Sequence, residues 1–205
     1  MWKRPPSSVR VYLEVKVFEK VRRNYRRVLY KHRQPVRSFL YNWTKALYGL
    51  SYCYANTEAV YMVDRFGNGF YYPDLYSEGH PIFRFTAWEG EDDFGILFGK
   101  GTTSPTLDDT DLESPIPHGT SSGQLYYNST HTAHETDSDR SRLIVWRTAD
   151  NESGGDITVS EIGLAFDVYT GQHYLVLILR DVLDTAVVVA YGQSIEGRYV
   201  MEFVL

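Results

Sequence analysis

Cysteine is almost absent from this chain, whose 205 residues include a single one, Cys53. One cysteine excludes an intramolecular disulfide and every zinc site that needs several cysteines. No apolar run approaches the ~20 residues that a membrane-spanning helix needs, and residues 1–16 lack the uninterrupted apolar stretch of a secretion signal. We therefore expect a protein that is made in a cytoplasm and has neither disulfides nor membrane spans.

Proline is also scarce, with 8 residues, whereas hydrophobic residues reach 43% and charged residues 23%. This composition excludes a wholly disordered chain. The main surplus is tyrosine, with 17 residues. Because tyrosine combines a large ring with a polar hydroxyl, it favours strands and interfaces. A chain of this length is expected to form one domain, or one domain with an arm.

Charge is distributed unevenly along the chain. Residues 1–45 hold 13 of the 21 Lys and Arg but only 2 of the 26 Asp and Glu, so this segment carries +11 and the rest of the chain −16. Such a contrast predicts that the basic segment meets an acidic partner, either nucleic acid or the body of a neighbouring copy. Basic and apolar residues are interleaved there in a strand-like pattern, which favours the neighbouring copy.

Alternating hydrophobicity predicts a mainly β protein. Val11, Leu13, Val15 and Val17 share one face of an expected strand, and residues 27–32 can return as the second strand of a hairpin. In the C-terminal third, apolar residues again alternate from Ile162 to Val168, and later strands follow glycine or polar turns. Strands at this spacing predict an antiparallel β-sandwich or jelly roll. Residues 66–69 are expected to form a further hairpin turn.

One segment has helical spacing. In residues 38–50, Phe39, Trp43 and Leu47 recur at intervals of four, with Ser38 as the expected N-cap and Gly49 as the C-terminal stop. The aromatic stripe either packs on the core, which we favour, or docks on a partner subunit. The predicted organisation is a basic arm and hairpin over residues 1–37, an amphipathic helix over 38–50 and a β-sandwich body over 51–205.

The stretch 101–156 is the least regular, and a structureless connection of that length is improbable in a compact domain. Short strands are therefore expected within it, with 125–127 and 143–146 as the best candidates. Residues 131–139, with two histidines and three carboxylates, lack the spacing of known metal motifs, so we interpret them as a surface loop. The carboxylates of 107–113 do not match a calcium loop and are expected to cap turns.

Other short motifs also fail on geometry. Residues 99–103 lack the spacing of a phosphate-binding loop, and we expect a strand leading into a glycine turn. Residues 119–123 match the letters of a nucleophile elbow, but no strand and helix flank them. The sequence therefore assigns no catalytic, cofactor-binding or metal-binding residue, and we expect a protein that is not an enzyme.

Several stretches, taken in order, resemble a family of small structural proteins of tailed viruses, encoded by phages and head-tailed archaeal viruses. They are RSFLYNWTKALYGL (37–50), GILFGKGTTSPTLDDTDLESPIPHG (95–119), NESGGDITVSEIGLAF (151–166), LILRDVL (177–183) and YGQSIEGRYVMEF (191–203). The resemblance covers most of the chain from about Lys31 onward. It implies a β-rich virion component, present in multiple copies and assembled in the host cytoplasm, in the tail, the neck or attached to the capsid. No catalytic residue is associated with these motifs.

Ten residues are candidates for contacts between copies or with other virion proteins. They are Arg22, Arg23, Arg26, Arg27, Arg33, Arg37, Phe39, Trp43, Glu161 and Arg180. Glu161 and Arg180 are charges within apolar strands, and such groups usually need a partner. We expect Glu161 or Asp181 to pair with Arg180, or these charges to bridge subunits.

The expected function is therefore structural, by oligomeric assembly through sheet edges, aromatic surfaces and the basic arm. Three alternatives stay open: a receptor- or glycan-binding adhesion module, a metal-dependent hydrolase acting at 131–139, and a nucleic-acid binder near a packaging portal. No cofactor is expected, and contact with nucleic acid is the less favoured use of the basic arm.

Overall fold

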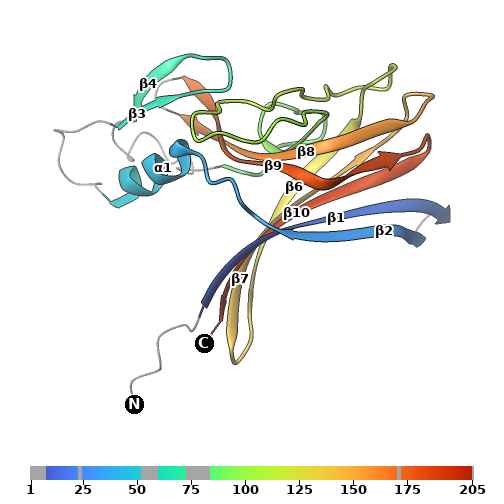
Figure 1. Ribbon diagram of the computed structural model, residues 1–205, viewed down its shortest axis with the longest axis horizontal. Coiled ribbons are helices and arrows are strands. Elements are labelled where there is room, and N and C mark those ends of the chain that lie inside the picture. The colour runs from blue at the N-terminus through green and yellow to red at the C-terminus, as the bar shows by residue number, and fades with distance from the viewer. Residues whose placement is uncertain (1–7, 23–24, 52–59, 73–83, 170–171, 205) are drawn as a thin grey trace.

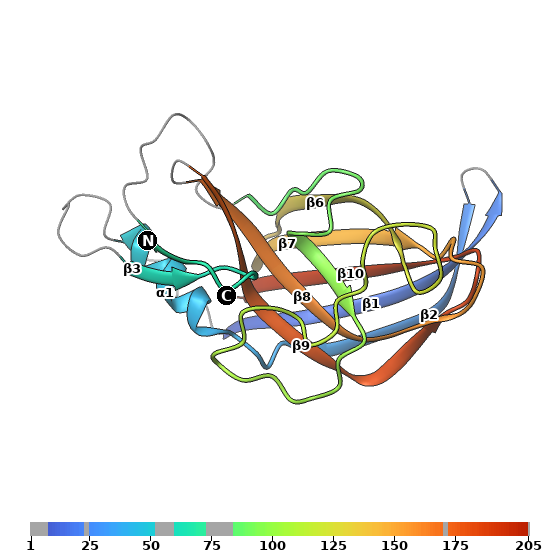
Figure 2. The same cartoon turned by 90° about the horizontal axis from the view of Figure 1, so that it is seen from above.

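The computed structural model describes residues 8–22, 25–51, 60–72, 84–169 and 172–204, and their fold is mainly β with one short helix, as the sequence predicted. The larger sheet has the order β2 (Tyr25–Pro35), β1 (Ser8–Arg22), β10 (Gln193–Val204), β7 (Arg140–Asp150), β6 (Tyr126–Thr136). The smaller sheet has the order β5 (Gly95–Gly99), β8 (Ile157–Tyr169), β9 (His173–Val189). A hairpin of β3 (Val60–Val63) and β4 (Gly69–Tyr72) and the helix α1 (Tyr41–Ser51) complete the set. All of these strand pairs are antiparallel, and the two larger sheets face each other (Figures 1 and 2).

The described part of the N-terminal basic segment is built into the sandwich. β1 pairs with β2 on one side, and with β10 on the other from Ser8↔Val204 to Glu19↔Gln193. Its inward side chains Leu13, Val15 and Val17 are buried in the main core. Residues 8–22 and 25–35 therefore belong to the five-stranded sheet and do not project as a separate arm.

The core lies between the two sheets. The alternation predicted for the C-terminal third is confirmed in β8, where Ile162, Leu164, Phe166 and Val168 all point into this core. The opposite face of β8 carries Gly163 and Ala165, and that face is buried too. A second apolar cluster covers it, and includes Ala87, Phe94, Leu97, Leu112 and Leu177.

Loops from residues 84–125 therefore form a third layer over the outer face of the small sheet. Gly163 lacks a side chain because this layer approaches closely: a Cβ there would lie 2.9 Å from a methyl of Leu112. β8 is consequently buried on both faces, which explains why its sequence is almost free of exposed polar residues.

The middle of the chain contains longer strands than predicted. β6 and β7 pair as a hairpin of two 11-residue strands. The predicted strand at 143–146 lies within β7, and the one at 125–127 overlaps the start of β6. The interpretation of 131–139 as a surface loop was wrong for 131–136, which pair with β7. His131 stacks on Trp146 with ring centroids 5.3 Å apart, and His134 Nε2 lies 3.0 Å from Ser141 Oγ.

The helix begins three residues later than predicted. Ser38 is not its N-cap, because Phe39 forms a β-bridge with Leu179 and the Leu40 N–H donates to Ile178 O. These extended residues tie the start of α1 to β9, and Gly49 lies within the helix instead of ending it. By contrast, the hairpin turn at 66–69 is confirmed, with Gly67 at a φ of 81° and the Asp64 carboxylate accepting N–H groups of Phe66 and Asn68.

Candidate functional site

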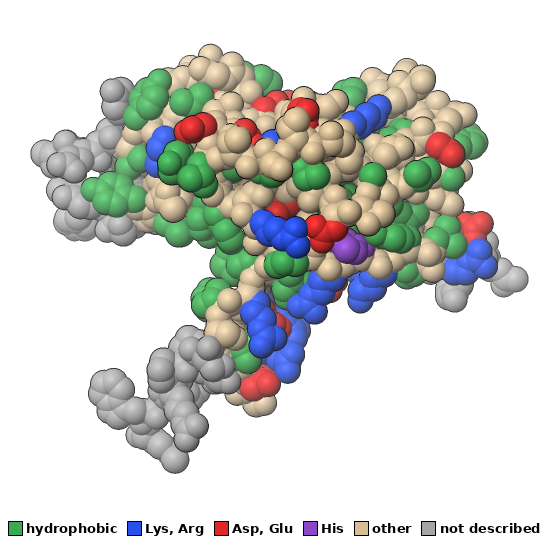
Figure 3. Space-filling model, viewed as in Figure 1, with side chains coloured by type: hydrophobic (Ala, Val, Ile, Leu, Met, Phe, Trp, Pro, Cys, Tyr) green, Lys and Arg blue, Asp and Glu red, His purple; other side chains and the backbone are tan. Residues whose placement is uncertain are grey.

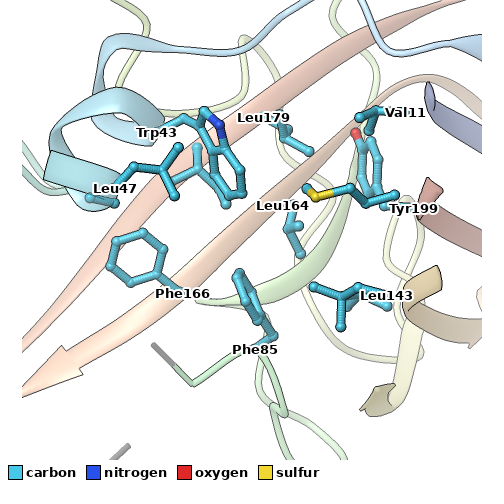
Figure 4. A pocket seen from close by; sticks show the side chains of 13 residues that line it. Val11, Trp43, Leu47, Phe85, Leu143, Leu164, Phe166, Leu179 and Tyr199 are labelled. Carbon is cyan, nitrogen blue, oxygen red and sulfur yellow. The ribbon is translucent and has the colours of Figure 1, made fainter. Parts of the chain in front are cut away.

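The two sheets diverge at the end of the sandwich that carries α1 (Figure 1). An apolar groove opens there, and Figure 3 shows the hollow on the same side of the molecule. Its volume is ≈ 200 Å³, and nearly every lining group is hydrocarbon or aromatic. The lining residues come from α1, both sheets and residue 85. They are Val11, Trp43, Ala46, Leu47, Phe85, Leu143, Val145, Leu164, Phe166, Ile178, Leu179, Tyr199 and Met201, all of which Figure 4 draws as sticks with nine labelled.

The helix supplies one wall because of its spacing. Trp43, Ala46 and Leu47 lie three and four positions apart, so they share one face, and that face lines the groove. Phe39 packs on Trp43 with ring centroids 5.8 Å apart. Both aromatic residues are half-buried against the core, as favoured from the sequence, yet Leu47 remains 47% exposed.

The opposite wall is the inner face of the five-stranded sheet, which continues beyond the small sheet. Where the sheets face each other, the inward side chains Leu13, Val145 and Tyr199 are buried. Toward the free end, the exposed fractions rise to 40% for Leu143 and 58% for Val9. We call this end the overhang; it comprises residues 8–11, 134–136, 140–143 and 201–204.

The overhang presents a face of core character to solvent. Its inward rows pair Val11 with Met201 and Leu143, and Val9 with Phe203, which is 41% exposed. The other face of the overhang is charged: Arg142 Nε lies 2.8 Å from Glu202 Oε1, and this ion pair lowers the pKa of Glu202. The inner face of the overhang is thus apolar on β1, on β10 and at Leu143, whereas its β6–β7 edge carries the polar residues His134, Ser141 and Thr136. The apolar part is continuous with the groove.

A second feature, the Glu161–Arg180 pair, lies inside the protomer. Arg180 Nε lies 2.9 Å from Glu161 Oε2, with Glu161 fully buried and Arg180 3% exposed. The Glu161 carboxylate also accepts N–H groups of Gly101, Glu113 and Ser114 at 2.8–3.1 Å. The expected pairing with Arg180 is thus confirmed for Glu161. The pair fastens the 101–114 loop onto β8 and β9, so neither residue can face another copy.

The acidic residues of 107–113 serve the same loop. Asp109 lies 2.6 Å from Arg180 Nη1; burial works to raise its pKa, but hydrogen bonds from Thr106 and Arg180 hold that pKa below its usual value. Glu113 accepts N–H groups of Thr102 and Thr103, and these bonds lower its pKa. These carboxylates are used in turns and ion pairs. In the part of the chain that the structure describes, no three His, Cys, Asp or Glu side chains gather as a metal site would require.

Arg147 was missed by sequence reasoning. Its guanidinium is fully buried, and its five N–H groups donate to the carbonyls of Trp88, Glu91, Phe94, Ile96 and Asn128. Burial lowers its pKa to about 10. The guanidinium carbon lies over the ring of Tyr127, 4.7 Å from the ring centroid. The available signal was its inward position in the alternating LIVWRTA segment, where an apolar residue was due.

Asp181 lies in the seam between the sheets, on the face of β9 opposite to Arg180. Its Oδ1 accepts the Arg37 N–H at 3.1 Å, and its Oδ2 lies 3.2 Å from the Tyr199 hydroxyl, which is also 2.9 Å from Ile162 O. Burial raises the pKa of Asp181 to about 6, although these hydrogen bonds oppose the rise. The residue connects the end of β2 to β9, immediately before the segment that leads into α1.

The remaining interface candidates are the arginines of the hairpin. Arg26, Arg27, Arg33 and Arg37 are exposed, whereas Arg23 and the side chain of Arg22 lie outside the described residues. Several cations of this segment have partners in the same chain: Lys16 with Glu196 at 3.0 Å, Arg27 with Glu19 at 2.9 Å and Arg37 with Asp184 at 2.9 Å. Arg33 stacks on Tyr12, 3.4 Å from its ring centroid.

These internal pairs reduce the free positive charge of the segment but do not remove it. Figure 3 shows Lys and Arg side chains along the lower part of the molecule, over the five-stranded sheet. The opposite loop layer is acidic: residues 89–113 contain 8 Asp and Glu and one Lys. The two outer surfaces of the molecule thus carry opposite charge.

No family model, curated protein or solved structure matches this chain. Among the described residues, no helix has the length and hydrophobicity to cross a membrane.

Proposed function

We propose that this protein is a non-enzymatic structural component of a tailed virus particle that acts by oligomeric assembly. The observation that carries the proposal is the overhang, a sheet end whose inward apolar side chains Val9, Leu143 and Phe203 are 40–58% exposed and which continues into the apolar groove. Contiguous exposed apolar surfaces on soluble proteins often mark interaction sites. The virion setting rests on the sequence resemblance alone.

The use of the charged groups supports the same proposal. The conspicuous buried charges, Glu161, Arg180 and Arg147, are saturated by ion pairs or by backbone groups. None of them faces the groove, whose walls are apolar. The groove thus has the character of a surface for packing, and the hydroxyl of Tyr199, the ionisable side chain in its lining, is held by hydrogen bonds to Ile162 O and Asp181 Oδ2.

The basic hairpin and the acidic loop layer lie on opposite outer surfaces, which suits contact between successive copies. Complementary charge steers association and fixes its orientation more than it adds affinity. In this proposal, apolar packing supplies the affinity, and the charged surfaces select how the assembled units meet in the particle.

The experiment is light scattering coupled to size-exclusion chromatography of the full chain, at about 0.15 M and about 1 M NaCl. Assembly through apolar surfaces predicts a mass above the 23.7 kDa of one chain at both salt concentrations. A mass of one chain at both would contradict the proposal.

A glycan-binding adhesion module of the virion is the second candidate, and one observation favours it. Trp88 is 68% exposed in a loop next to Glu89, and exposed aromatic rings beside carboxylates can stack on sugars and bind their hydroxyls. Binding on a glycan array that Trp88→Ala abolishes, with Tyr191→Ala as the matched control, would support this function; absence of binding by the wild type would exclude it for the sugars tested.

A further inference from the structure

We infer that the overhang is one half of a two-fold symmetric interface, in which the overhang of each copy enters the apolar groove of the other. The inference rests on the proposed function and names the surface and the partner, which is a second copy of this chain. In each copy, the other's overhang supplies the sheet layer that is missing beyond the end of the small sheet.

The sandwich is incomplete at the overhang. In the closed part of the molecule, the inward face of the five-stranded sheet packs on the small sheet, and Leu13, Val15 and Ile195 are buried. Two rows further along β1, the side chains have the same apolar character but no facing layer. Val9 is 58% exposed and Phe203 41%, and Figure 1 shows this end of the sheet diverging from the small sheet.

The exposed apolar surfaces are self-complementary. A projecting apolar sheet end and an apolar groove lie side by side in one chain, and they share Val11 and Leu143 (Figure 4) as well as Met201. A two-fold axis near these residues brings each overhang opposite the other's α1 wall, where Leu47 is 47% exposed. In such an isologous contact, both overhangs and both grooves are covered, and the assembly closes as a dimer. In a head-to-tail contact, one overhang and one groove would stay exposed at the two ends of the assembly.

The exposed area sets what the contact must include. At ~4.8 Å between strands and ~3.3 Å per residue, four strands and four residues give the overhang a face of about 250 Å². Two such faces packed together bury about 500 Å², which is about half of the ~1,000 Å² that a specific interface needs, so contacts with the α1 walls of the two grooves have to supply the rest. The outer face of the overhang, where Arg142 pairs with Glu202, points away from the second copy in this arrangement.

The test compares two glutamate variants by sedimentation equilibrium of the full chain. Leu143→Glu places a charge in the shared part of the overhang and groove. Val188→Glu is the matched control, because Val188 is an exposed strand residue at 56% that lies on β9, outside the groove lining. We expect Leu143→Glu to weaken dimerisation at least about 100-fold, since a two-fold interface carries each substitution twice, and Val188→Glu to leave it unchanged.

A cross-linking measurement covers the case in which Leu143→Glu fails to fold. In a Cys53→Ser background, Leu143→Cys or Phe203→Cys is expected to link to the same residue of a second copy through a short bismaleimide, giving a covalent dimer. Val188→Cys is expected to stay a single chain. Equal cross-linking at all three positions would overturn the inference.

The outcomes separate this inference from the proposed function. If the wild type assembles and Leu143→Glu assembles equally well, the two-fold overhang contact is wrong while oligomeric assembly stands. If the wild type is a single chain at every concentration, both proposals fail.

Discussion

At the scale of single residues, the buried charges explain why the irregular loops stay in place. Glu161 accepts four hydrogen bonds, three from backbone N–H groups of the 101–114 loop and one from Arg180. Arg147 also holds loops in place, but as a donor: its guanidinium donates hydrogen bonds to five backbone carbonyls of loops and strands. A carboxylate organises N–H groups and a guanidinium organises C=O groups.

The first prediction concerns Glu161→Gln. The substitution removes the charge that balances Arg180 and turns one acceptor oxygen into an N–H₂ group that faces other donors. Because breaking a buried ion pair leaves an uncompensated charge, the free energy of unfolding in urea should fall by about 3–5 kcal/mol. Glu113→Gln is the control and should lose much less, since its side chain is 37% exposed. Equal losses would mean that the pair is not what holds the loop.

The second prediction concerns Arg147→Met. It leaves several buried carbonyls without donors, so the free energy of unfolding should fall by about 3 kcal/mol or more. Arg198→Met on the neighbouring strand β10 is the control, because the side chain of Arg198 is half-buried and stacks on Trp146. Chemical denaturation at neutral pH measures both. A loss no larger for Arg147→Met than for Arg198→Met would contradict the assigned role.

The third prediction concerns pH. Burial raises the pKa of Asp181 to about 6 in the folded protein, above the 3.8 of a solvated aspartate, so the folded state binds this proton more tightly than the unfolded state. Its stabilising effect is complete below pH 3.8 and is lost as the pH rises through about 6. Relative to Asp181→Asn, the wild type should gain at most about 3 kcal/mol between pH 8 and pH 4.

Urea denaturation of both proteins across this pH range measures the effect. The comparison with Asp181→Asn cancels the opposite contributions of Asp109 and Glu202, whose lowered pKa values make them lose stability as the pH falls. A difference between the two proteins that does not change with pH would show that Asp181 does not titrate in this range.

Sequence reasoning found some of these residues and missed others, for a physical reason. Glu161 and Arg180 stood out because a charge in an apolar strand needs a partner, and each proved to be the partner of the other, on adjacent strands. Arg147 did not stand out, because its partners are backbone carbonyls that lie up to 59 positions away in the sequence and have no side-chain signature. Local patterns do not reveal such partners.

At the scale of elements, strand alternation was predictable and element boundaries were not. The inward face of β8 follows from its period of two, which any sheet would impose. The start of α1 depends instead on the bridge between Phe39 and Leu179, a contact across 140 positions of sequence. A prediction from helical spacing alone therefore included residues 38–40 in the helix, although the contact with β9 holds them in an extended conformation.

The fourth prediction concerns Gly101, at the start of the 101–114 loop. A Cβ at Gly101 would lie 2.5 Å from Glu161 Oε1 and 2.5 Å from the Glu113 Cβ. Gly101→Ala should therefore displace the loop and lower the free energy of unfolding by about 1–3 kcal/mol. Gly155→Ala is the control, because nothing lies within 4 Å of a Cβ there.

Hydrogen exchange gives the specific readout for Gly101→Ala. The N–H groups of Glu113 and Ser114, which donate to Glu161 in the wild type, should lose protection before the β8–β9 pairs do. Unchanged protection at these two positions would mean that the loop tolerates the added methyl group.

At the scale of the whole molecule, the sequence predicted a sandwich but not its incomplete end. The groove exists because the two sheets diverge and one continues past the other, which depends on relative strand length and sheet twist. Val11, Leu143 and Met201 have the pattern of ordinary inward residues, and nothing local distinguishes them from Leu13 or Val145. The hairpin expected within the basic segment 1–37 is confirmed as β1 and β2, and it forms part of the large sheet.

This arrangement also changes which experiment can test the basic segment. Removal of residues 1–37 would delete β1 and β2 and expose the core that Leu13, Val15 and Val17 help to form. Loss of assembly in such a deletion would report loss of folding. Substitutions on the exposed surface of the hairpin, such as Arg26→Ser and Arg33→Ser, leave the sheet intact and are the appropriate change.

The central claim is that this chain works by packing against copies of itself. Sedimentation equilibrium of the unmodified full chain, from about 1 to about 100 µM, tests it most directly, because affinities in this range correspond to about 6–8 kcal/mol of association free energy. The account predicts a mass of at least twice the 23.7 kDa of one chain, approached as the concentration rises. A single species of 23.7 kDa throughout this range would contradict it.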